Sequence, residues 1–73
     1  MQRFGEKLRA LRTTRQMTLK ELASALGLTA HGYISEMEAG KKKPTTEFVL
    51  KVARYFKVST DQLLKDELDV EGK

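Results

Sequence analysis

The side chains that usually carry out enzymatic or metal chemistry are scarce in this sequence. Its 73 residues include one histidine, His31, and no cysteine. No glycine-rich phosphate cradle occurs, and no base or orienting group is evident for His31. The carboxylates near the C-terminus lack the spacing and central glycine of a calcium loop; they are Asp66, Glu67, Asp69 and Glu71. We therefore expect no catalytic residue, no metal, no cofactor and no enzymatic activity.

Positive charge is concentrated in the first part of the chain. Residues 1–43 contain nine Lys or Arg and four Asp or Glu, a local charge of +5, whereas residues 44–73 contain five and six, a local charge of −1. Three consecutive lysines, Lys41, Lys42 and Lys43, belong to the positive part. Such a surface attracts nucleic-acid phosphates, but charge runs often only solubilise a protein. Charge alone leaves both interpretations open.

Apolar residues recur at helical spacing through most of the chain, and no stretch alternates with the period of two that a strand requires. We predict five helices, over residues 2–15, 18–26, 30–39, 46–56 and 60–67. The core-facing stripes are Phe4, Leu8 and Leu11; Leu19, Leu22, Ala23 and Leu26; Ile34 and Met37; and Val49, Val52, Ala53 and Phe56.

Local signals mark the helix ends. Gly27 and Gly40 follow apolar runs, where a helix end favours a left-handed residue. Thr45 or Thr46, just after Pro44, could cap the fourth helix. Capping boxes are expected where a Ser or Thr precedes a Glu or Gln by three residues; they are Thr18 with Glu21, and Ser59 with Gln62.

The short linkers predict one domain over residues 1–67, followed by an acidic tail, residues 68–73, that we expect to be disordered. No apolar run approaches the roughly 20 residues of a membrane helix. The N-terminus also lacks the apolar core of a secretory signal. We therefore expect a cytoplasmic protein with no membrane contact.

Residues 18–44 are predicted to form two short helices joined by a tight connection that starts at Gly27. Such a short turn makes the second helix cross the first at a steep angle. The second helix can then project its outer side chains toward a DNA major groove.

The ordered residues of this segment resemble the helix-turn-helix domain of Cro and lambda-type phage repressors, the xenobiotic-response-element group. The resemblance spans about residues 4–65 and rests on Leu22, Ala23, Gly27, Ile34, Ser35, Glu38, Gly40, Lys41, Pro44, Leu50, Ala53, Val58 and Leu63. It implies an all-α, five-helix, lambda-repressor-like DNA-binding domain with the helix-turn-helix at the second and third helices. It also implies a nucleoid-associated transcriptional regulator, a repressor, that binds double-stranded DNA at a palindromic operator as a homodimer.

The sequence departs from the family pattern at two places. Gly27 and Ser35 are eight residues apart rather than the usual seven, which leaves Thr29 and His31 as alternative caps of the third helix. Leu19 replaces a glutamine that binds phosphate in several phage repressors. That contact is then absent, or is made by Thr18 or Lys20.

Aligned backward from the end of the third helix, the resemblance places His31, Gly32 and Glu36 where the family reads base edges, with Tyr33 between them. His31 could bind guanine or a phosphate, or remain a solvated capping residue. Gly32 would allow close approach to the groove. Tyr33 suits a thymine methyl or a phosphate, or a partly buried packing site. Glu36 can accept from cytosine N4, or face solvent.

The family also places the loop after the third helix on the DNA backbone. We therefore expect backbone contacts from the residues near this helix that could donate to phosphate; they are Thr18, Lys20, Thr29, Lys41, Lys42 and Lys43. The alternative for the three lysines is a solubilising loop.

Two further predictions concern the stability and the assembly of the domain. Arg12 matches a family arginine that pairs with the glutamate at Glu38, which implies an ion pair between the first and third helices. Leu64 and Leu68 are four residues apart and outside the core stripe. We predict that the fifth helix and the residues just after it form a self-complementary dimer contact. The rival function is a protein-interaction module or an antitoxin that binds a protein partner with the same helices.

Overall fold

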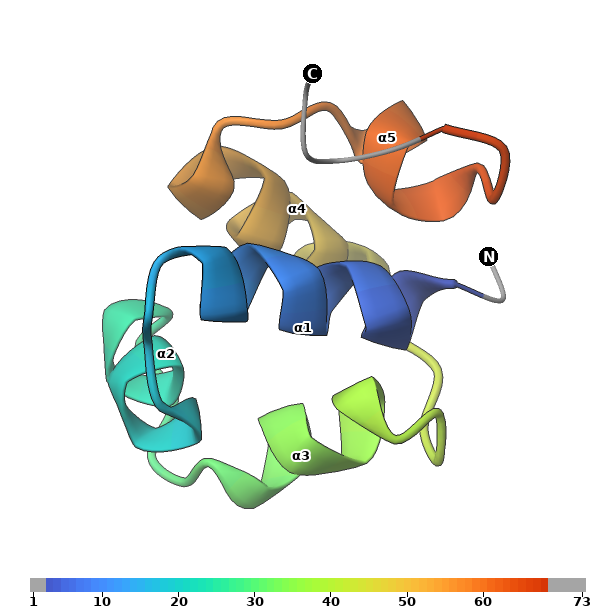
Figure 1. Cartoon of the computed structure of the whole chain (residues 1–73). Helices are drawn as coiled ribbons and strands as arrows, with labels where there is room; N and C mark the ends of the chain where they lie inside the picture. The colour runs from blue at the N-terminus through green and yellow to red at the C-terminus, as the bar shows by residue number, and fades with distance from the viewer. Residues whose placement is uncertain (1–2, 69–73) are drawn as a thin grey trace.

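The structure is a computed structural model that describes residues 3–68 of the chain. Five helices follow one another without any strand in this part of the chain: α1 Phe4–Thr14, α2 Leu19–Ala25, α3 Gly32–Glu38, α4 Thr46–Phe56 and α5 Thr60–Leu64. Helix α1 runs across the middle of the molecule, with α2 and α3 on one side and α4 and α5 on the other (Figure 1). The expected all-α, five-helix architecture is therefore confirmed. Of the acidic tail, residues 69–73 lie outside the described residues.

The core lies where the apolar faces of the helices meet. Its buried members are Phe4, Leu8, Leu11, Leu22, Ala23, Leu26, Ile34, Met37, Phe48, Val49, Val52, Ala53, Phe56 and Leu63. Leu19, which the sequence assigned to the core stripe of α2, is only partly buried. None of the helices within residues 3–68 is long and apolar enough to cross a lipid bilayer.

The helix ends follow the local chemistry of the sequence. Both capping boxes form, and Thr45 rather than Thr46 caps α4 by accepting from the Phe48 amide at 3.1 Å. Gly27 and Gly40 have φ values of 77° and 76°, the left-handed conformation expected after α2 and α3. These caps satisfy amides and carbonyls that would otherwise lack partners at the helix ends.

Helix α5 is shorter than predicted, because it ends at Leu64 rather than at residue 67. Lys65 has extended backbone, and the chain then turns onto the start of α1, where the Arg3 amide donates to Asp66 Oδ1 at 3.0 Å. Lys7 of α1 is 1% exposed, and its Nζ donates to the carbonyls of Gln62 and Lys65. The buried Lys7 side chain of α1 therefore caps the C-terminal end of α5.

Candidate nucleic-acid interface

Helices α2 and α3 are joined by a turn that begins at Gly27. The Gly27 amide donates to the Ser24 carbonyl at 3.1 Å, and the Leu28 amide donates to the Ala23 carbonyl at 2.8 Å. Leu28 is partly buried against the core, and Ile34 and Met37 anchor the inner face of α3 with exposures of 0% and 1%. The helix is thus held by its inner face, while its other side lies at the surface.

The start of α3 shows which of the two candidate residues, Thr29 or His31, occupies the N-cap position. His31 occupies the N-cap position, but its side chain accepts no capping hydrogen bond, and Thr29 lies two residues earlier. The His31 side chain is exposed and is not used to hold the helix.

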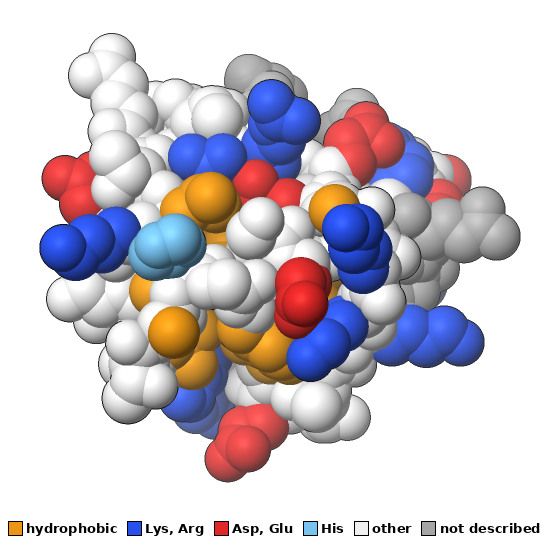
Figure 2. Space-filling view, turned by 90° about the horizontal axis from the view of Figure 1, so that it is seen from below, with side chains coloured by type: hydrophobic (Ala, Val, Ile, Leu, Met, Phe, Trp, Pro, Cys, Tyr) orange, Lys and Arg blue, Asp and Glu red, His pale blue; other side chains and the backbone are white. Residues whose placement is uncertain are grey.

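The outer face of α3 looks toward the viewer in Figure 2, where Lys and Arg side chains lie around the rim of the surface and acidic side chains lie among them. His31 and Gly32 are exposed, and Glu36 is half-exposed. Tyr33 is half-buried, and its ring packs edge-on against Phe48 with the centroids 5.1 Å apart. Within residues 3–68, the structure therefore leaves three of the four predicted base-reading positions open and uses the fourth partly for packing.

Gly32 has no structural reason to be glycine. A Cβ atom built on it meets no other atom within 4 Å, and its φ is not in the left-handed region. The absence of a side chain here opens the outer surface of α3 at its first turn.

Arg12 and Glu38 form the ion pair expected between α1 and α3. Arg12 Nε donates to Glu38 Oε2 at 2.7 Å, and a second guanidinium nitrogen donates to Oε1 at 3.0 Å. The third donates to the carbonyl of Met17 at 2.8 Å. The two charged side chains are only 14% and 9% exposed. The hydrogen bonds to Glu38 raise the pKa of Arg12 although partial burial acts in the opposite direction.

Comparison with known proteins decides the family. The family model described as helix-turn-helix matches residues 8–63, which include α2, the turn and α3. The chain belongs to the helix-turn-helix family. This membership confirms the lambda-repressor-like fold class, and it agrees with the expectation of a regulator rather than an enzyme.

Two curated relatives of this helix-turn-helix chain come from Bacillus subtilis (strain 168). RghR, an HTH-type transcriptional repressor, is 42% identical over 67 residues, which cover 88% of this chain and 47% of RghR. YonR, an SPbeta prophage-derived uncharacterized HTH-type transcriptional regulator, is 39% identical over 62 residues, which cover 85% of this chain and 56% of YonR. The chain thus spans about half the length of these relatives.

Among solved structures, the N-terminal DNA binding domain of SinR from Bacillus subtilis superposes with a TM-score of 0.81. It is 28% identical to this chain, and the match covers 92% of this chain and 97% of the SinR domain. The likeness therefore extends over the whole helical arrangement.

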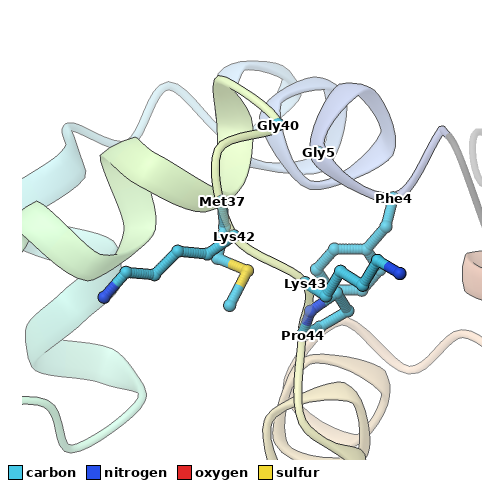
Figure 3. A pocket seen from close by; sticks show the side chains of 7 residues that line it. All are labelled: Phe4, Gly5, Met37, Gly40, Lys42, Lys43 and Pro44. Atoms are coloured by element: carbon cyan, nitrogen blue, oxygen red, sulfur yellow. The ribbon is translucent and has the colours of Figure 1, made fainter.

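The loop after α3 carries the three consecutive lysines, and all three are exposed. Two of them, Lys42 and Lys43, point in different directions. Figure 3 shows the side chain of Lys42 running toward α3 and that of Lys43 running the other way, toward Phe4. Between them lies a pocket of about 420 Å³, lined by Phe4, Gly5, Met37, Gly40, Lys42, Lys43 and Pro44. Lys42 Nζ lies 3.2 Å from Glu36 Oε1.

The remaining predicted backbone contacts lie at the starts of α2 and α3. Thr18, Lys20 and Thr29 are all exposed. The Thr18 hydroxyl accepts from the Glu21 amide at 3.0 Å, so its own proton remains available to donate outward.

The leucines predicted for the dimer contact differ from each other in exposure. Leu64 is half-buried against the core, contrary to its expected place outside the core stripe, whereas Leu68 is 37% exposed. Leu50, at 38% exposure, lines a pocket of about 330 Å³ between α4 and α5 together with Leu64. Sequence reasoning gave Leu50 no role at an interface.

Gly5 is a structural residue that sequence reasoning missed. A Cβ at this position would lie 2.2 Å from the Met37 carbonyl oxygen, so close that the backbone would have to shift. Gly5 therefore lets α1 approach the end of α3 closely. A glycine inside a predicted helix was the available signal, because glycine disfavours a helix interior and implies some other reason to be there.

Proposed function

We propose that this chain is a sequence-specific double-stranded DNA-binding transcriptional regulator, a repressor that binds a palindromic operator as a homodimer. The observation that carries the proposal is the position of α3, which is anchored by Ile34 and Met37 while its outer face stays open, with several Lys and Arg side chains around it. Such a helix fits the major groove of B-DNA. A regulator of this kind works in the cytoplasm, at the nucleoid.

In this proposal α3 reads base edges through His31, Glu36 and the hydroxyl side of Tyr33, and Gly32 allows the helix to approach the groove. Backbone contacts orient the domain and contribute most of the salt-dependent affinity. They come from Thr18, Lys20, Thr29, Lys41, Lys42 and Lys43. The exposure of each of these side chains, complete or partial, supports the assignment.

The partner in the dimer is a second copy of this chain. The apolar side chains that support this contact are Leu64 and Leu68, and the exposed Leu50 beside Leu64 extends the surface. In the proposed dimer the two α3 helices lie in successive major grooves, with half-sites about 34–36 Å apart. An interaction with a different protein on this surface is the alternative.

The test measures DNA binding over a range of salt concentrations, with an operator selected by the protein from a random pool. About eight phosphates per dimer predict a slope of log affinity against log salt near −7. Lys41→Met should reduce the magnitude of this slope, whereas Lys57→Met, at the far end of α4, should leave it unchanged. A slope near zero, or binding of a protein partner but not of DNA, would overturn the proposal.

A further inference from the structure

Lys42 contacts two of the side chains on the outer face of α3. Its Nζ lies 3.2 Å from Glu36 Oε1 and 5.8 Å from the centroid of the Tyr33 ring. Tyr33 is itself held by its edge-on contact with Phe48. The ammonium group therefore sits beside an anchored ring and a carboxylate that are three residues apart on one helix face.

The next residue in the same loop, Lys43, does not share this environment. Lys43 extends in the opposite direction, along the pocket that ends at Phe4 (Figure 3). The two side chains carry the same charge within the same loop but point to different parts of the surface. The difference offers a matched pair for experiment.

The pair with Glu36 contributes little to folding. The side chains of Lys42 and Glu36 are 54% and 47% exposed, and exposed ion pairs stabilise proteins only slightly. When α3 lies next to DNA, the same pair affects the free energy of binding. An unpaired carboxylate on α3 would be repelled by the phosphates on both sides of the groove, and that repulsion acts against any base contact that Glu36 makes.

We propose that Lys42, which was counted above among the backbone contacts, instead determines specificity by positioning and neutralising Glu36. With Lys42 beside it, the Glu36 carboxylate enters the groove as part of a neutral pair and accepts a hydrogen bond from cytosine N4. Tyr33 supports the ammonium group from the side of α3. This inference rests on the proposed function, because it assumes that α3 reads DNA.

The test is a double-mutant cycle of Lys42→Met and Glu36→Gln, with affinity measured for the selected operator and for random-sequence duplex. Lys42→Met should weaken operator binding about tenfold per subunit when Glu36 is present, the equivalent of about 1.4 kcal/mol. In the Glu36→Gln background, the same change should cost no more than about twofold, because no carboxylate remains to be neutralised. Glu36→Gln alone should relax the preference at one base pair and strengthen binding to random duplex.

The control is Lys43→Met. It should weaken binding to the operator and to random duplex by the same factor, whether residue 36 is Glu or Gln. Equal losses from Lys42→Met in both backgrounds, or a greater loss with Glu36→Gln, would overturn the inference and make Lys42 an ordinary phosphate contact. If Lys43→Met and the α3 variants leave DNA binding untouched, the proposed function itself fails. Unchanged melting temperatures would show that all variants are folded.

Discussion

Replacement of Arg12 by alanine tests how α3 is held against α1. The guanidinium makes two hydrogen bonds to Glu38 and one to the Met17 carbonyl, in a setting where both charged side chains are largely covered. Arg12→Ala removes all three bonds and leaves the Glu38 carboxylate without its cation. The cost comes mainly from this stranded charge and not from the lost attraction alone.

Removal of one member of a buried pair typically costs about 3–5 kcal/mol, and the remaining exposure of this pair favours the lower end. For a domain of this size, 1 kcal/mol corresponds to a change in melting temperature of about 4–8 °C. A loss of about 3 kcal/mol therefore predicts a melting temperature lower by about 12–24 °C. Small domains have only about 5–15 kcal/mol of stability, so the effect is large.

The assay is thermal unfolding followed by circular dichroism, with Arg9→Ala as the control. Arg9 lies on the same helix but is exposed, so its removal should change the melting temperature by no more than a few degrees. The double variant Arg12→Met with Glu38→Met should recover most of the lost stability, because no charge is then left unpaired. An unchanged melting temperature for Arg12→Ala would refute this reasoning.

A pH titration would not replace this experiment. The pKa of Arg12 is raised in the folded state, so its contribution to stability is fully present below the unfolded pKa and is lost only as pH rises through the higher folded value. That window is strongly alkaline. Mutation is the practical way to remove the pair.

Three further substitutions separate packing from recognition. Gly5→Ala should destabilise the domain by about 1–3 kcal/mol in urea unfolding, because the new methyl group meets the rigid Met37 carbonyl; wild-type stability would contradict the close approach of α1 and α3. Lys7→Met removes the hydrogen bonds that the buried ammonium group donates to the end of α5. The amides of α5 should then exchange hydrogen faster, and unaltered exchange would exclude this capping role. Gly32→Ala should leave the melting temperature within a few degrees of wild type yet weaken operator binding, and an equal affinity would show that the open surface at Gly32 is not used.

Local sequence signals predicted those parts of the fold that depend on local chemistry. The capping box at Thr18 and the left-handed glycines at Gly27 and Gly40 each act within one helix turn, so their residue types suffice. The Arg12–Glu38 pair spans 26 residues, and the resemblance to a known family was needed to anticipate it.

The missed features depend on contacts between distant segments. At the end of α5, Lys7 donates to two carbonyls that lie 55 and 58 residues away in the sequence, and the periodicity of α5 gives no sign of these contacts. The sequence also presented residues 41–43 as three equivalent charges. The different directions of Lys42 and Lys43 depend on how the loop runs from α3 past the start of α1, which only the assembled structure defines.

In the function proposed above, the exposed side of α3 is the surface that meets DNA. The most direct test of this contact is a titration of ¹⁵N-labelled protein with the selected operator duplex at low salt. We predict that amide shifts concentrate on Gly32–Glu38 and on residues 41–43, with the C-terminal end of α4 unaffected. Shifts confined to other helices, or no shifts at a saturating concentration of duplex, would show that α3 does not meet DNA.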